Sequence, residues 1–178
     1  MKYDPDKHHR RSIRLKGYDY SQAGAYFVTV CIQNREHLLG DVSGGEMHPS
    51  EAGEMVIGVW NDLTVRYPAV ELDAFAVMPN HVHGIVIVGA GQALPCHAGA
   101  ASVAPTLGDV VRSFKSLSAI QVNRRLMRTG PLWQRNYYER VIRNEAELKD
   151  TRQYILDNPA NWDHDENNTR ILQEAQSI

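Results

Sequence analysis

The stretch Val70-Glu-Leu-Asp-Ala-Phe-Ala-Val-Met-Pro-Asn-His-Val-His-Gly-Ile-Val-Ile-Val88 contains two apolar runs separated by Pro79-Asn80. The first run, residues 70–78, alternates two sets of apolar side chains, and the second, residues 81–88, is rich in β-branched residues. Both patterns predict strands. Because Pro and Asn favour tight turns, the stretch predicts an antiparallel hairpin.

The remaining sequence predicts further strands and helices on both sides of this hairpin. Strands are expected over residues 25–33, near 38–42 and over 137–143. Helices are expected from Pro49-Ser50-Glu51 to Tyr67, over 107–127 and over 145–158. Residues 89–106, rich in Gly, Ala, Pro and Ser, predict a long mobile loop. This order predicts an α+β fold, an antiparallel sheet with helices packed on one face.

Length and composition indicate one globular domain. The chain has 178 residues, of which 43% are hydrophobic, enough for a substantial core. No run of about 18 apolar residues is present, so no membrane span is expected. The first residues do not resemble a signal peptide, so a cytoplasmic protein is expected. Cys31 and Cys96 form no C-x-x-C pair and predict neither a zinc framework nor a disulfide framework.

Charge is distributed unevenly along the chain although the net charge is only −2. Residues 1–16 carry six Lys and Arg against two acids, and residues 112–152 carry ten against four. The segments 17–111 and 153–178 are acidic, with two basic residues against ten acids and one against five. Two basic blocks in an acidic chain favour a localised site for a polyanion, although a helix with a solvated basic face explains the pattern equally well.

His81-Val82-His83 is the sharpest local signal for chemistry. Residues two apart in a strand point to the same face, so both imidazoles project together and can bind one divalent cation. Two surface histidines on a half-exposed strand are the simpler interpretation of an isolated His-x-His motif. A catalytic metal site also requires more than two ligands.

Two other patterns add candidate site residues. Tyr154 and Asn158 lie one helical turn apart, so they offer a nucleophile and a third metal ligand, although such a pair is more often a core residue and a helix end. Residues 132–143 interleave aromatic and basic side chains that could stack on unpaired bases and hold phosphates, or could form an ordinary amphipathic strand. These residues are Trp133, Arg135, Tyr137, Tyr138, Arg140 and Arg143.

Four ordered motifs together resemble one known family. The motifs are Met78-Pro-Asn-His-Val-His83, Ser113-Phe-Lys-Ser116, Leu132-Trp-Gln-Arg-Asn-Tyr-Tyr138 and Tyr154-Ile-Leu-Asp-Asn-Pro159. They are similar to motifs of the tyrosine transposases associated with repetitive extragenic palindromes (REP), which belong to the His-hydrophobic-His nuclease superfamily. The resemblance covers roughly residues 10–162, and each motif alone is weak.

The resemblance implies a ferredoxin-like fold with the histidine pair on a central strand. It implies that His81 and His83 bind a divalent ion, Mg²⁺ or Mn²⁺, that Asn158 completes the metal shell, and that Tyr154 is the nucleophile. The implied reaction nicks and rejoins single-stranded DNA, at hairpin or palindromic elements, through a 5′-phosphotyrosine intermediate. Arg112 and Lys115 are expected to face DNA phosphates.

The sequence leaves several alternatives open. A non-cleaving DNA-hairpin-binding protein of the same fold and a metal-dependent RNA-processing hydrolase that activates water would both use the same histidines. A small α+β interaction domain with surface histidines is the least specific alternative. Both a monomer and a homodimer are compatible with the sequence. We expect a basic arm over residues 1–16, a nuclease domain over 17–162 and an acidic tail over 163–178.

Overall fold

The structure, a computed structural model, describes residues 24–89, 105–165, 167 and 168. The expected basic arm, nearly all of the expected mobile loop and the last ten residues lie outside this part of the chain. The two apolar runs of the central hairpin form strands with the expected bounds, β4 (Val70–Met78) and β5 (His81–Val88), and they pair antiparallel.

Four strands form the main sheet, in the order β4-β5-β1-β6, with every neighbouring pair antiparallel. Strand β1 spans Gly24–Cys31 and strand β6 spans Tyr138–Ile142. The helices α1 (Glu51–Asn61) and α3 (Leu107–Arg125) connect the strands, so the chain follows the β-α-β-β-α-β pattern of ferredoxin-like folds. The predicted α+β class and antiparallel sheet are confirmed.

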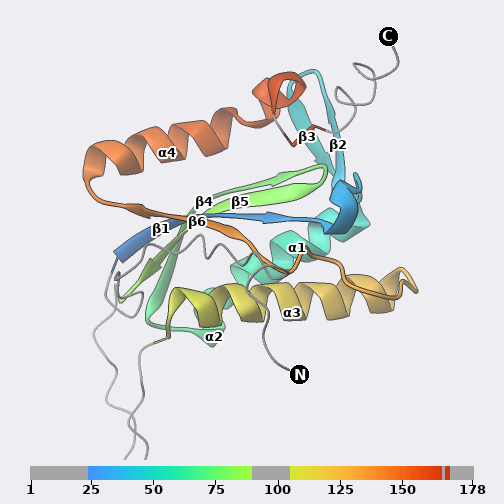
Figure 1. The fold of residues 1–178 in the computed structure, drawn as a ribbon, viewed down its shortest axis with the longest axis horizontal. Helices are drawn as coiled ribbons and strands as arrows, with labels where there is room; N and C mark the ends of the chain where they lie inside the picture. Colours follow the sequence, from blue (N-terminus) through green and yellow to red (C-terminus); the bar gives the residue numbers. More distant parts are fainter. Residues whose placement is uncertain (1–23, 90–104, 166, 169–178) are drawn as a thin grey trace, which may run out of the picture.

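The helices lie on both faces of this sheet (Figure 1). Helices α1 and α3 cover one face, and α4 (Glu145–Asp157) covers the other. The sequence prediction of helices on one face holds for α1 and α3 and is wrong for α4. Helix α4 lies on the second face because the two central strands, β1 and β5, bury side chains on both faces of the sheet. Both faces therefore need to be covered by helices.

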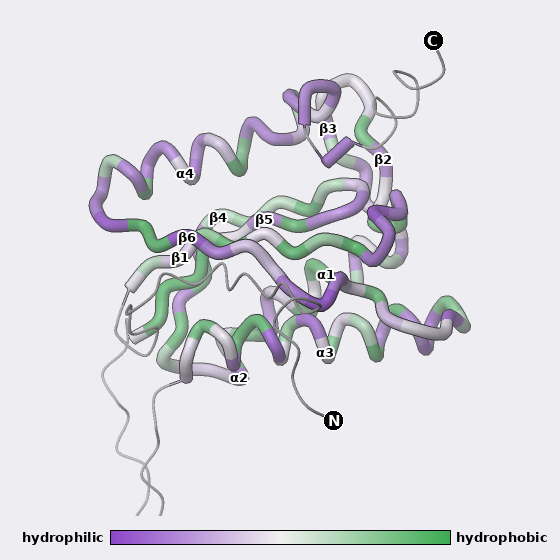
Figure 2. Tube along the Cα trace, viewed as in Figure 1, coloured by the Kyte–Doolittle hydropathy of each residue, from purple (hydrophilic) through white to green (hydrophobic). Residues whose placement is uncertain are grey.

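The larger core lies between the sheet and the pair α1 and α3. Trp60 stacks on Phe75 with ring centroids 4.3 Å apart and meets the edge of Phe114 at 5.4 Å. A Cβ atom at Gly84 would lie 2.4 Å from the Trp60 ring, so this position of β5 must be glycine for the indole to lie against the strand. Figure 2 shows apolar residues concentrated where the strands face these helices.

Side-chain caps set the beginnings of the three long helices. Ser50 Oγ accepts from the Gly53 N–H at the start of α1, and Thr106 with Asp109 forms a reciprocal capping box at the start of α3. At the start of α4, Asn144 Oδ1 accepts from the Glu147 N–H at 2.9 Å. Within the described residues, no helix combines the length and the apolar character that crossing a bilayer requires.

The structure departs from the sequence expectations between the main elements. The looser strand expected near residues 38–42 is one arm of a separate hairpin, β2 (Gly40–Ser43) with β3 (Glu46–Pro49). The helix expected to run to Tyr67 is divided at Asp62 into α1 and the short α2 (Leu63–Arg66). Two short 3-10 helices, η1 (Gln33–Arg35) and η2 (Pro159–His164), complete the described chain.

Candidate metal centre and active site

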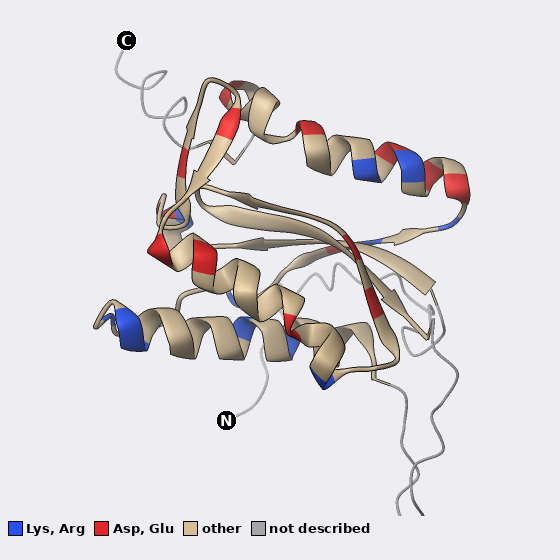
Figure 3. Cartoon of the chain, turned by 180° about the vertical axis from the view of Figure 1, so that it is seen from behind, with Lys and Arg blue, Asp and Glu red and all other residues tan. Residues whose placement is uncertain are grey.

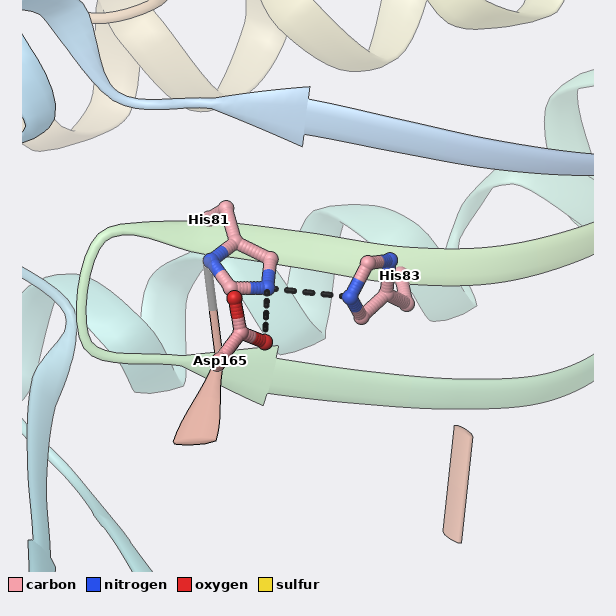
Figure 4. A group of neighbouring side chains, drawn as sticks. All are labelled: His81, His83 and Asp165. Carbon is pink, nitrogen blue, oxygen red and sulfur yellow. Dashed lines mark hydrogen bonds and ion pairs between the residues drawn. The ribbon is translucent and has the colours of Figure 1, made fainter. Parts of the chain in front are cut away.

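His81 and His83 lie side by side on β5 and point to the same face of the sheet (Figure 4). Their Nε2 atoms are 3.0 Å apart. Both side chains are buried, with exposed fractions of 0% and 2%. The alternative of two half-exposed surface histidines is therefore excluded.

The hydrogen-bond network around Asn80 assigns the tautomer of His81. The Asn80 side-chain amide nitrogen donates to the carbonyls of Asn167, at 2.7 Å, and Arg35, at 3.4 Å. Its Oδ1 therefore faces His81 Nδ1, at 2.8 Å, and accepts the proton of that nitrogen. The Nε2 lone pair of His81 is left to face His83. The hydroxyl of Thr29 is 2.8 Å from His83 Nδ1 and, unlike a carbonyl, can bond to either tautomer of that ring.

Burial keeps both imidazoles neutral at neutral pH. It lowers the pKa of His83 from its usual 6.5 to about 4, with Asp165 acting weakly in the opposite direction. It also lowers the pKa of His81 well below its usual value, and electrostatic repulsion from the protonated form of His83, from Arg35 and from the protonated form of His37 adds to this effect. Neutral imidazole nitrogens are the form that binds metal ions.

Asp165 brings a carboxylate to the histidine pair. Its Oδ2 is 3.9 Å from His81 Nε2, and the three side chains converge in Figure 4. One donor atom from each of the three residues lies within 4.8 Å of the other two. The Asn167 N–H donates to the other carboxylate oxygen at 2.6 Å and so fixes the orientation of this side chain. Two nitrogens and one oxygen thus form a group that could hold a metal ion.

Asn158, the expected third ligand, lies at the end of α4 and is 4% exposed. Its Oδ1 is buried and has no hydrogen-bond partner among the described residues. The side chain also makes no capping bond to η2, which argues against the alternative of a simple helix cap. A buried acceptor without a partner costs free energy unless a ligand or water satisfies it.

The donor types of this group suit a divalent cation, because imidazole nitrogens and carboxylate oxygens are both common ligands of such ions. The 3.0 Å between the two Nε2 atoms is the distance of a hydrogen bond between the rings.

Tyr154 lies over this group, at the edge of a cleft of about 550 Å³ between the sheet and α4. Its ring contacts His83 edge-on, with centroids 5.4 Å apart, and contacts Phe27 at 5.9 Å. The side chain is 50% exposed. Tyr138 and Arg140 of β6 line the same cleft. The expected nucleophile, one histidine of the pair and the cationic side chain of Arg140 thus line one cavity.

The fold has a counterpart among known structures. A REP-associated tyrosine transposase, solved bound to a REP hairpin, superposes with a TM-score of 0.59 over 82% of this chain and 72% of its own, at 20% identity. The chain has the fold of a REP-associated tyrosine transposase. A proposed transposase from Deinococcus radiodurans R1 gives a TM-score of 0.46 over 80% of this chain and 95% of its own, at 22% identity.

Sequence comparison places the chain in a family. An uncharacterised protein of Haemophilus influenzae is 37% identical over 174 residues, which are 93% of this chain and 96% of that protein. The two proteins belong to one family. No family model matches the chain.

Within this transposase fold, the residues expected to bind DNA divide between the two faces of the sheet. Tyr138 and Arg140 line the cleft that contains His83 and Tyr154. A second group lines a groove beside α3, on the other face. It consists of Arg112, Lys115, Trp133, Arg135 and Tyr137. Arg143 is exposed at the end of β6 and lines neither. Figure 3 shows Lys and Arg at positions along α3 and α4.

Two of these residues have structural roles that the sequence did not indicate. Trp133 is only 5% exposed, and its indole N–H donates to Ser118 Oγ at 2.9 Å. Its ring packs in the core, so Trp133 has a structural role there in addition to lining the groove. Lys115 Nζ donates to the carbonyls of residues 134, 135 and 136, at 2.7, 3.0 and 3.4 Å, and so holds this segment against α3.

The site also contains residues that the sequence reasoning missed. Asp165 lies in the segment that was expected to be an acidic tail. The described residues of this segment pack against the hairpin of β4 and β5, and Asn168 is only 4% exposed. No periodic sequence pattern indicates Asp165, because its position next to the histidines depends on the turn that follows η2. The sequence pattern identifies Asn80 only as a turn residue, although a side-chain amide directly before a histidine of metal-ligand type can indicate a hydrogen-bond partner for that ring.

An ion pair attaches α4, and with it Tyr154, to the edge strand β4. Arg152 Nε donates to both carboxylate oxygens of Asp73, at 2.8 and 3.1 Å, and the guanidinium holds the pKa of Asp73 below its usual value. A depressed carboxyl pKa stabilises the folded state above the unfolded pKa, and this contribution disappears as the pH falls through the folded value.

We expect Arg152→Gln to lower the midpoint of thermal unfolding at pH 7 by no more than about 2 °C, because the pair is partly solvent-exposed. The difference from the wild type should shrink between about pH 5 and pH 3, as Asp73 becomes protonated. Lys149→Gln, which removes one exposed charge from the same helix, is the control. A difference for Arg152→Gln that is equally large at pH 3 would contradict this account.

Proposed function

We propose that the protein is a metal-dependent transposase-type nuclease that nicks and rejoins single-stranded DNA through a covalent bond to Tyr154. The observation that carries the proposal is the contact between the Tyr154 ring and His83, beside the group of His81, His83 and Asp165. A hairpin-forming DNA strand is the proposed substrate. The transposase with the same fold, which was solved bound to a REP hairpin, supports this choice.

Each residue has a distinct part in the proposed reaction. His81, His83 and Asp165 hold the cation, and the unpartnered Oδ1 of Asn158 offers a fourth donor. A divalent ion there would polarise the scissile phosphate and neutralise its developing charge. Arg140, exposed in the cleft with Nη2 3.4 Å from Thr151 Oγ1, holds the phosphate backbone.

The proposed step exchanges one phosphate ester bond for another and needs no external energy source. The Tyr154 hydroxyl oxygen attacks the phosphorus, and the bond between phosphorus and the 3′ oxygen breaks. The phenol loses its proton, and the departing 3′ oxygen gains one, which leaves a free 3′-hydroxyl and a 5′-phosphotyrosine. Because the phosphodiester energy is retained in the new ester, attack by a 3′-hydroxyl restores an intact strand.

The test is incubation of the full chain with labelled single-stranded hairpin DNA and Mn²⁺ or Mg²⁺, followed by denaturing electrophoresis. We expect a protein–DNA species that survives denaturation, appears only with the cation and disappears after protease treatment. Cleavage without this species would favour the hydrolase that activates water. Binding without cleavage at any cation concentration would favour the non-cleaving DNA-binding protein.

A further inference from the structure

A groove of about 480 Å³ lies on the face of the sheet opposite the proposed active site. It runs between α3 and residues 131–137. Three of its lining residues, Val111, Leu132 and Trp133, belong to the core shared with α1, whereas the catalytic cleft lies beneath α4. Its volume is within the range of about 300–1,000 Å³ typical of ligand sites. The proposed reaction at Tyr154 makes no use of this groove.

The groove is built by fixed contacts. Lys115 holds one wall in place through its three bonds to the carbonyls of residues 134–136. Trp133 lies in the base of the groove, tied to Ser118 and packed on Phe114 at 5.6 Å. Small residues on α3, Gly108 and Ala119, leave the other wall open.

Its charge favours an anion. Three cationic side chains, Arg112, Lys115 and Arg135, line the groove, and none of its described lining residues is acidic. Arg112 is paired with Asp109 at 3.1 Å, but its side chain is 78% exposed, so the pair is weak and can be exchanged for a phosphate. The chain's own basic segment, residues 1–16, carries a net charge of +4 and is therefore a poor occupant.

The position of β6 connects this groove to the catalytic cleft. Strand β6 is an edge of the sheet, so nothing in the described sheet pairs with its outer side. Tyr137 lines the groove and its neighbour Tyr138 lines the cleft. A chain of nucleotides that passes over the β6 edge meets an aromatic side chain and an arginine on each face, with Arg135 on one and Arg140 on the other.

We propose that the groove between α3 and residues 131–137 is a second nucleotide site, which binds an unpaired base and its phosphate from the same DNA strand that reaches Tyr154 around β6. An apolar base with cationic side chains at the rim is the chemistry that binds single strands without a sequence requirement. This inference rests on the proposed function for the choice of DNA as the polyanion.

The test compares the affinities of the full chain for unstructured single strands of about 6 and about 16 nucleotides, measured by fluorescence anisotropy without a divalent cation. The wild type should bind the longer strand more tightly. The double variant Arg112→Gln/Arg135→Gln should lose about tenfold for the longer strand but little for the shorter. Its log–log salt slope for the longer strand should fall by about 1.4, because each lost phosphate contact contributes about 0.7.

Two further variants make the result specific to the groove. Arg66→Gln/Arg124→Gln removes the same charge from exposed positions outside it and should leave the preference for the longer strand unchanged. Ser116→Trp, at an exposed position of α3, fills the groove without changing charge and should reduce that preference. Equal losses in both double variants, or an unaltered Ser116→Trp protein, would overturn the proposal. These binding measurements do not depend on adduct formation. If no adduct formed, the proposed reaction at Tyr154 would be contradicted, but the proposed groove site would not.

Discussion

Tyr154→Phe should abolish the covalent protein–DNA species, with a loss of at least about a thousandfold in its rate of formation. The substitution removes the attacking oxygen and leaves the ring, which keeps its contacts with His83 and Phe27. The variant should therefore fold and bind DNA as the wild type does. Denaturing electrophoresis measures the adduct, and fluorescence anisotropy on the same preparation measures binding.

Tyr138→Phe is the matched control. Tyr138 is exposed to a similar degree, 47% against 50%, lines the same cleft and also contacts Phe27, at 6.4 Å. It differs in lying on β6 rather than on α4. We expect Tyr138→Phe to retain the adduct. If Tyr138→Phe lost the adduct and Tyr154→Phe kept it, the assignment of the nucleophile would be wrong.

Loss of either histidine should remove metal binding and cleavage together. His81→Ala and His83→Ala each delete one of two nitrogens held 3.0 Å apart, and we expect Mn²⁺ affinity to fall by more than about a hundredfold. Asp165→Asn should cost less, about tenfold, because the neutral amide keeps an oxygen donor. Asn158→Ala should weaken metal affinity least. Isothermal titration calorimetry with Mn²⁺ measures these affinities, and the adduct assay measures cleavage.

The control for this series is His48→Ala, which removes an exposed histidine on β3 and should change neither property. Measurements of Mn²⁺ affinity and thermal stability distinguish the roles of the two oxygen donors, Asp165 and Asn158. If Asn158→Ala lowered thermal stability but left Mn²⁺ affinity unchanged, Asn158 would be a structural residue and Asp165 the main oxygen ligand. Wild-type Mn²⁺ affinity in His83→Ala would refute the metal centre.

The sequence allowed the strands of the main sheet and the helices to be predicted, but not where every helix lies. The runs 70–78 and 81–88 gave the correct bounds of β4 and β5, because alternation and a Pro-Asn turn are local properties. Which face a helix covers is decided by distant residues. Ile155 shows that α4 has an apolar side, but only the second buried face of β1 and β5, with Phe27 and Ile85, shows where that side packs.

The sequence allowed the relative positions of site residues to be predicted where two of them lie on the same strand or helix. The spacing of His81 and His83 on a strand, and of Tyr154 and Asn158 on a helix, follows from periodicity. The convergence of His83 and Tyr154 on one cleft was implied only by the family resemblance. Asp165 comes from a turn after η2, where no periodicity applies, and Trp133 is buried because Ser118 and Phe114 enclose it. Both depend on tertiary contacts that spacing alone does not reveal.

The unequal cores on the two faces of the sheet have a thermodynamic consequence. Among the described residues, twenty-three buried side chains form the core beneath α1 and α3, but only five form the core beneath α4. Helix α4 is therefore the element that local unfolding should release first. A cation shared by His81 and Asp165 would act as a reversible cross-link between β5 and the chain that follows α4. By mass action it would oppose this release by about 2.7 kcal/mol at a concentration one hundred times its dissociation constant. The helix that carries the proposed nucleophile would then be held most firmly when the centre is loaded and able to react.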